Sequence, residues 1–286
     1  MANKILLSSD TPCDIGPELM RRYAVSLFPL HIHIGDDCYT DGVDITLPDV
    51  YRIWREKGLM PRTAAINPEE YIAYFRPLVE QGYDILHISL GSALSCSHQN
   101  CVLAAESFPG RVYVIDSCSL STGFGLLVCE AGERILRGME IARVYDEVRA
   151  LVPNTRASFI LDTLEFLHAG GRCSGLAQLS ATVLNLKPTI LVRNELSGSM
   201  SVGKKYIGKL DKCLLKYVED QLKGRTDICL DRVFITFSTM ADETIEAVKR
   251  RVLELQPFAE VFTTRASCTI GAHCGPNTLG VLFLVK

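Results

Sequence analysis

Hydrophobic and polar residues alternate in blocks along the first half of the chain. Short apolar runs end in serine or aspartate and are followed by stretches with helical spacing. The expected strands are residues 4–9, 25–34, 83–90 and 111–116, and the expected helices are 48–57, 68–81, 94–108 and 120–137. Strands and helices that alternate in this way are typical of a parallel sheet with helices on both faces.

The second half has a different pattern. Strand-like runs lie at 158–161, 188–193, 233–238, 259–264 and 279–285, a turn at 194–198 leads into 200–207, and amphipathic helices are expected at 209–223 and 242–255. We therefore predict an α/β fold with two domains: an N-terminal parallel-sheet domain, residues 1–153, and a C-terminal mixed-sheet domain, residues 154–286. Because no long linker separates them, the two should share a packed interface, with the ligand between them.

Composition narrows the function classes. A formal net charge of −3 over 286 residues offers no basic face for nucleic acid. The apolar run at residues 5–7 is too short for a signal peptide, and no window approaches a membrane span. We expect a cytoplasmic protein with at most transient membrane contact. The eleven cysteines include no Cys-x-x-Cys pair, so we expect reduced cysteines, many of them packed as small hydrophobes.

Hydroxyl-bearing residues follow three of the expected strands, at 8–11, 91–97 and 117–122. Ligands of open parallel sheets gather beyond the carboxyl ends of the strands, and the start of a helix favours an anion. Each cluster taken alone is also explained as an ordinary helix cap. Three clusters at one edge of a sheet favour an anion site.

Two further segments carry polar groups on glycine-rich backbone. Gly170-Gly171 ends a short apolar helix and is followed by Arg172, whose guanidinium can bind a carboxylate or phosphate through two hydrogen bonds. A solvated arginine after a helix end explains the same segment. Residues 269–280 are expected to form an irregular loop that carries His273, which either donates a hydrogen bond to an anion or is solvated.

Other motifs are incomplete. The stretch 198–205 resembles a phosphate-binding loop but ends in Lys205 where a hydroxyl is required. His31 and His33 lack a second pair of ligands at metal-site spacing, and no Gly-x-Ser-x-Gly turn is present. We therefore expect no metal, no cofactor and no catalytic residues.

Eight short motifs then occur in order along nearly the whole chain. They are Ser9-Asp10-Thr11 with Asp14, residues 39–45, Arg62-Thr63 before Pro68, residues 92–99, Ile115-Asp116-Ser117, residues 164–167 with Gly170-Gly171-Arg172, Lys187-Pro188, and residues 271–276. In this order they resemble the DegV family of bacterial fatty-acid-binding proteins, with motifs such as Y-x-D-G-x-D-I, L-E-Y-L-x-x-G-G-R and G-x-H-x-G-P. The resemblance implies a fatty acid held between two α/β domains.

The resemblance also implies particular residues and a partner. Thr63, Ser95, Arg172 and His273 look like the residues that bind the carboxylate of a long-chain fatty acid such as palmitate, stearate or oleate. The implied partner is a fatty acid kinase subunit, which converts the presented carboxylate to an acyl phosphate for phospholipid synthesis. The sequence departs from the family motifs at Ala64-Ala65, Cys96-Ser97 and Asn277, all near the expected head-group site.

Elementary energetics support a lipid ligand. Burying about 15 methylene groups at roughly 0.8 kcal/mol each yields on the order of 12 kcal/mol before association costs. Apolar residues at 120–131 and 176–186 could line the tail tunnel or belong to ordinary core. Two alternatives remain at this stage: an enzyme for a small carboxylated or phosphorylated substrate with His273 as general acid or base, and a structural interaction protein.

Overall fold

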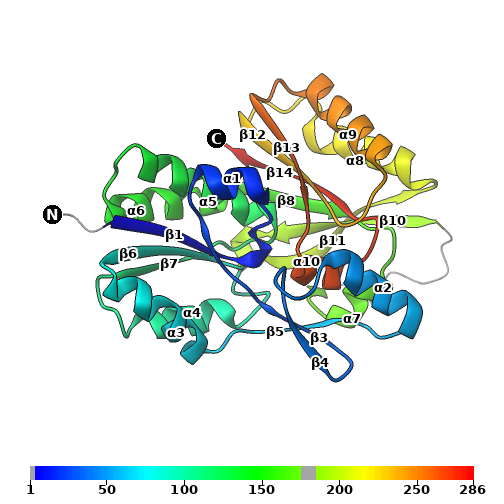
Figure 1. Cartoon of the computed structure of the whole chain (residues 1–286). Helices are drawn as coiled ribbons and strands as arrows, with labels where there is room; N and C mark the ends of the chain where they lie inside the picture. The colour runs from blue at the N-terminus through cyan, green and yellow to red at the C-terminus, as the bar shows by residue number, and fades with distance from the viewer. Residues whose placement is uncertain (1–3, 175–184) are drawn as a thin grey trace.

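The computed structural model describes residues 4–174 and 185–286, and its first sheet is parallel throughout. The strand order is β2-β1-β6-β7, formed by β1 (Lys4–Asp10), β2 (Ser26–Phe28), β6 (Tyr83–Ser89) and β7 (Val112–Asp116). Figure 1 shows helices on both faces of this sheet, which confirms the predicted architecture. They are α3 (Pro68–Glu80) and α4 (Ser97–Ala105) on one face, and α1 (Gly16–Arg22), α5 (Thr122–Leu136) and α6 (Ile141–Leu151) on the other.

Local capping chemistry explains where the early helices begin. Asn67 accepts a hydrogen bond from the N–H of Glu70 at 2.9 Å, and Pro68 opens α3, where its missing N–H is not needed. Thr46 and Asp49 form the equivalent box at the start of α2 (Leu47–Lys57). The predicted helix at 94–108 is shorter at both ends, because residues 91–95 instead form turns beyond β6.

The second half forms a mixed seven-stranded sheet in the order β13-β12-β14-β8-β10-β11-β9. Its strands are β8 (Thr155–Ile160), β9 (Cys173–Ser174), β10 (Leu186–Arg193), β11 (Ser199–Ile207), β12 (Ile228–Phe237), β13 (Glu260–Arg265) and β14 (Leu279–Val285). Helices α8 (Leu210–Leu222) and α9 (Asp242–Leu255) cover the outer face, and the inner face packs toward the first sheet. The mixed sheet that the sequence predicts is confirmed.

A third, three-stranded sheet was not expected. It has the order β4-β3-β5 and consists of β3 (His31–Ile34), β4 (Asp37–Thr40) and β5 (Arg62–Ala64). The single strand predicted over 25–34 is therefore wrong, because β2 pairs with the first sheet and β3 with this one. Pro29 lies between them and has no N–H to continue a ladder.

The predicted irregular loop at 269–280 is also wrong in its first half. Residues 268–274 form a helix, α10 (Cys268–Cys274), which packs against α7 (Glu165–Gly170) and α2. Ser267 caps this helix, since its side chain accepts from the N–H of Ile270. Gly271 is needed for packing and not for a turn: a Cβ there would lie 2.1 Å from Cδ1 of Leu47.

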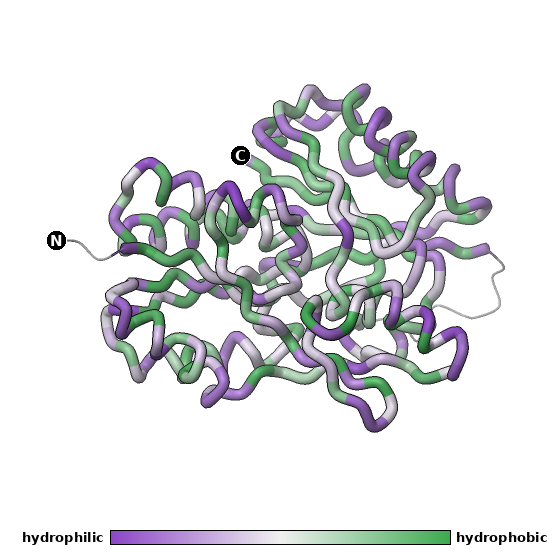
Figure 2. The backbone as a smooth tube through the Cα atoms, viewed as in Figure 1, coloured by the Kyte–Doolittle hydropathy of each residue, from purple (hydrophilic) through white to green (hydrophobic). Residues whose placement is uncertain are grey.

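The two halves share one apolar core. Residues of both halves, such as Phe124, Phe159 and Leu282, belong to a single buried cluster, and Figure 2 shows hydrophobic residues concentrated along the strands. Helix α5 lies between the two sheets, where Gly123 and Gly125 allow close approach of β8 and of the backbone at Cys13. A short 3-10 helix (Val152–Asn154) stands at the expected domain boundary, which itself stays a prediction.

Candidate functional site

A cavity of about 160 Å³ lies where the two large sheets, the small sheet and α10 meet. All four residues expected to bind a carboxylate line it: Thr63, Ser95, Arg172 and His273. They come from β5, the turn before α4, the corner after α7 and the last turn of α10. Apolar side chains make up much of the remaining lining, among them Leu30, Leu90, Leu94, Leu120, Phe159, Leu167, Met200 and Leu282. The cavity therefore combines polar groups suited to an anion with apolar walls.

Thr63 and His273 form the polar centre of the cavity. Thr63 Oγ1 and His273 Nε2 are 2.8 Å apart, which joins β5 to α10 across 210 residues of sequence. Burial, and then the positive charge of Arg172, lower the pKa of His273 to about 4. The imidazole is consequently neutral near pH 7 and carries one ring proton.

The two ring nitrogens have different surroundings. His273 Nδ1 is buried with no hydrogen-bond partner among the described residues. It lies against Gly170, where a Cβ would come within 2.2 Å of it. Nε2 is the nitrogen that meets Thr63, as donor when it carries the ring proton and as acceptor when Nδ1 does. When Nε2 donates, Thr63 accepts from His273 and its own hydroxyl proton is available to a ligand in the cavity.

His273 contacts a hydroxyl group of the protein. Nε2 lies 2.8 Å from Thr63 Oγ1, and Nδ1 lies against Gly170. The ring therefore orients the threonine hydroxyl.

Ser95 combines a local structural contact with its place in the wall. Its Oγ accepts a hydrogen bond from the N–H of Ser97 at 3.1 Å and lies 2.9 Å from the Ser97 hydroxyl. Ser97 in turn accepts from the N–H of Ile66 at 3.2 Å. When Ser97 donates to Ser95, the Ser95 proton is free to point into the cavity. Cys96, not Ser95, is the N-cap residue of α4, so the bond from Ser97 is a local turn contact, and it is compatible with a ligand contact.

Arg172 lies at the rim and is exposed. Its Nη1 donates to the carbonyl of Gly170 at 2.6 Å, which holds the side chain over the glycine corner. Gly171 ends α7 with a φ of 65°, a conformation that favours glycine. The guanidinium is therefore in contact with water at the rim of the cavity, so any ion pair that it forms with a ligand is partly screened.

Some lining residues were not found from the sequence, and some expected ones do not line the cavity. Ser121 and Thr269 contribute hydroxyls to the wall. Of the segment 120–131, Leu120 and Ser121 reach the cavity, whereas Phe124 and Leu127 are buried in the core. Most of the other expected segment, 176–186, lies outside the described residues. Helix periodicity does not reveal which residues line the cavity, because the lining is formed by elements that are distant in the sequence.

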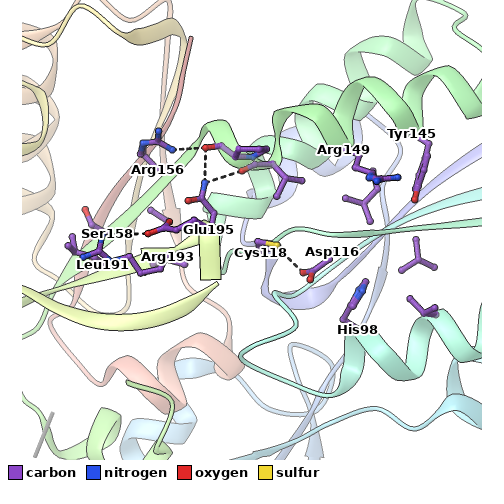
Figure 3. Close-up of a pocket in the computed structure, with 18 of the residues that line it drawn as sticks. His98, Asp116, Cys118, Tyr145, Arg149, Arg156, Ser158, Leu191, Arg193 and Glu195 are labelled. Carbon is purple, nitrogen blue, oxygen red and sulfur yellow. Dashed lines mark hydrogen bonds and ion pairs between the residues drawn. The ribbon is translucent and has the colours of Figure 1, made fainter. Parts of the chain in front are cut away.

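A second, larger hollow of about 1190 Å³ lies among α4, β7, α6, β8 and β10 (Figure 3). Arg149 and Tyr145 of α6 lie on one side of it, and Arg156 of β8 and Arg193 of β10 on the other. None of the four expected carboxylate-binding residues lines it. The smaller, more apolar cavity is therefore the candidate ligand site.

The described residues hold neither a group of metal ligands nor a membrane-spanning helix. Within residues 4–174 and 185–286, no three His, Cys, Asp or Glu side chains are grouped as metal ligands would be. His31 is paired with Glu70 at 2.6 Å, and His33 lies 3.8 Å from Cys38 Sγ. No helix in the same residues has the length and apolar character needed to cross a membrane.

Fold and cavity together define a two-domain α/β protein with a largely apolar cavity at its interface, lined in part by hydroxyl, imidazole and guanidinium groups. A family profile described as an uncharacterised protein of the DegV family matches residues 4–286, so the chain belongs to the DegV family. A DegV domain-containing protein of Caldanaerobacter subterraneus subsp. tengcongensis is 31% identical, over 99% of both chains.

Solved structures of similar proteins share the whole architecture. A DegV family protein from Thermus thermophilus, described as binding fatty acid, superimposes with a TM-score of 0.87 at 29% identity, covering 99% of this chain and 100% of that chain. A stearic-acid-binding protein from Eubacterium ventriosum has a TM-score of 0.81 at 23% identity, covering 99% and 98% of the two chains. At that lower identity the likeness shows the shared fold.

Proposed function

We propose that this protein binds a long-chain fatty acid in the interdomain cavity, with the carboxylate at Thr63, Ser95, Arg172 and His273. The observation that carries this proposal is that these four residues, from four elements, line one cavity whose walls are otherwise largely apolar. The similar protein from Thermus thermophilus, described as binding fatty acid, supports the same ligand class. A buried carboxylate requires hydrogen-bond donors, and the hydroxyls of Thr63 and Ser95 supply them.

The proposed ligand also requires movement of the walls. The cavity of about 160 Å³ is smaller than typical small-molecule sites, which measure about 300–1,000 Å³. Side chains such as Met200 and Phe237 must therefore shift to admit a full acyl chain. The unbranched, flexible side chain of methionine suits such a wall.

We further propose that the protein is a carrier and not an enzyme, and that it presents the carboxylate to a fatty acid kinase subunit for acyl-phosphate formation. The exposed polar end at Arg172 supports presentation, because the head group would lie at the rim while the tail is buried.

The binding proposal is tested by ligand extraction and by variants. Native mass spectrometry of protein purified from cells should show a bound long-chain acid. Thr63→Val should weaken palmitate binding about tenfold, because a charge-assisted hydrogen bond is worth roughly 1.5–3 kcal/mol. Arg172→Ala should cost about 1 kcal/mol, since the exposed guanidinium is screened.

Hexadecanol is the control ligand and Arg62→Ala the control variant, because Arg62 is an exposed arginine of β5 that does not line the cavity. Hexadecanol binding should change little in every variant. Equal losses for acid and alcohol in Thr63→Val, or a wild-type protein that binds neither, would refute the proposal. Adding the kinase subunit with ATP tests presentation separately, through formation of acyl phosphate.

A further inference from the structure

Two buried carboxylates from the N-terminal half hold the first turn of α10. Asp41 is 2% exposed and accepts the N–H groups of Cys268 and Thr269, each at 2.9 Å, and the Thr269 hydroxyl at 2.6 Å. Asp14 is 7% exposed and accepts the Ser267 N–H at 2.9 Å and the Ser121 hydroxyl at 2.5 Å. These bonds use N–H groups that have no partner inside a helix.

The small sheet contacts α10 at both ends. Asp41 directly follows β4 and binds the first turn, while Thr63 of β5 binds His273 in the last turn. Strand β3 pairs with both β4 and β5, so the two contacts belong to one rigid unit. Between them the Tyr51 hydroxyl donates to the carbonyl of Gly271 at 3.1 Å. The helix that carries His273 therefore cannot slide or turn without breaking bonds to this sheet.

Capping alone does not account for the carboxylates. Ser267 already accepts from the Ile270 N–H, which is the usual cap for such a helix. No salt bridge to Asp14 or Asp41 is found among the described residues. Asp41 and Asp14 lie 227 and 253 residues along the chain from the N–H groups that they bind, so their bonds also fix where α10 lies against the N-terminal half.

We propose that Asp41, assisted by Asp14, is a positioning residue of the carboxylate site: it holds α10 so that His273 Nε2 meets Thr63 Oγ1. The consequence for binding rests on the function proposed above. Asp41 does not touch the ligand. It acts by keeping His273 Nε2 in hydrogen-bond contact with Thr63 Oγ1. When the ring donates this bond, the threonine hydroxyl is free to donate to the fatty acid.

The test combines a spectroscopic signature with binding. In protein labelled with ¹⁵N-histidine, the His273 ring, assigned through His273→Gln, should show the Nε2–H tautomer with a slowly exchanging proton. Asp41→Asn should average the two ring nitrogens or abolish that protection, and Asp14→Asn should do so to a smaller degree. Palmitate affinity should fall about tenfold in Asp41→Asn, with hexadecanol affinity changed less than about threefold.

Val252→Ala is the matched control, because Val252 is a buried residue of α9 in the core beside α8 and is not part of α10. At an equal loss of melting temperature it should leave both the ring signal and palmitate affinity unchanged. An unaltered His273 signal in a folded Asp41→Asn or Asp14→Asn protein overturns the proposal. If wild-type protein binds no palmitate while the ring signal still depends on Asp41, then the proposed function fails and the positioning role stands.

Discussion

At the residue scale, the main result is that His273 orients a hydroxyl and does not carry charge. Thr63 lies at Nε2 of the ring and Gly170 at Nδ1. Burial, and then the positive charge of Arg172, lower the pKa of the ring. The histidine lines the cavity where we propose that a carboxylate binds, but the loop expected to carry it is a helix. A helix position is rigid, which suits a residue that must hold one tautomer.

The depressed pKa of His273 predicts a pH dependence of stability. The folded protein takes up this proton near pH 4, whereas the unfolded chain takes it up near 6.5. The unfolded state therefore binds more protons in this window, and the contribution of His273 to stability falls as pH drops from about 6.5 to 4. The full shift corresponds to about 3 kcal/mol. Urea unfolding of wild type and His273→Gln across this range should show the difference.

Asp14 and His168 provide the controls for the pH dependence of stability. Burial raises the pKa of Asp14 to about 7, so its own contribution changes in the opposite direction, falling as pH rises from about 4 to 7. Comparing wild type with His273→Gln removes this background, because both contain Asp14. His168→Gln alters an exposed histidine and should follow wild type throughout. Parallel curves for wild type and His273→Gln would contradict the expectation.

At the element scale, α5 shows why glycines in an apolar helix were hard to interpret. The sequence left open whether residues 120–131 line a tunnel or form core. The structure shows glycines used for close packing: a Cβ at Gly125 would lie 2.4 Å from the Cys13 carbonyl oxygen and 2.6 Å from Cγ2 of Ile15. Backbone cannot move aside as a flexible side chain does.

Gly125→Ala tests this role through the sign of its effect. In an open helix, replacing glycine by alanine stabilises by roughly 1 kcal/mol. Here the methyl group would overlap the backbone at Cys13, and we expect a net loss of about 1–3 kcal/mol in the free energy of unfolding. Leu136→Ala, at an exposed position of the same helix, should stay within about 0.5 kcal/mol of wild type. A stabilised Gly125→Ala protein would show that α5 can move away.

At the scale of the whole molecule, the halves are joined by polar contacts as well as by the shared core. Arg232 of β12 is 8% exposed and donates to the Tyr23 hydroxyl at 3.0 Å and to Glu260 at 3.0 Å. Glu133 of α5 lies 3.8 Å from the same guanidinium and accepts from Tyr23 at 2.7 Å. One arginine of the second half thus binds a tyrosine hydroxyl and lies near a carboxylate of the first half.

Removing this arginine should weaken the joined structure. Arg232→Met leaves the partly buried carboxylates of Glu133 and Glu260 without their shared cation, and we expect a loss of about 2 kcal/mol. Thermal unfolding followed by circular dichroism would measure it. Arg225→Met is the control, because Arg225 pairs with the exposed Asp227 alone among the described carboxylates and should matter little. Equal melting temperatures for both variants would mean that the apolar core alone joins the halves.

Much of the fold follows from sequence because its causes are local. Prolines after capping residues place the starts of α2 and α3, and blocks of apolar residues place β1, β6, β7 and β14. The alternation of these elements predicts the parallel sheet. The three-stranded sheet was not predicted, because β5 is distant in the chain from its partner β3 and because strands of three or four residues carry too little periodicity.

The candidate site also has features that the sequence predicts and features that only the structure decides. Sequence alone determined which residue types were present at Thr63, Ser95, Arg172 and His273, and the family to which their motifs belong. Only the tertiary structure decided that these four line one cavity, that Gly170 covers His273 Nδ1, and that Asp41 holds α10. The physical reason is that tautomer, burial and hydrogen-bond partner depend on contacts across some 200 residues of chain, such as the 210 between Thr63 and His273. No local pattern encodes them.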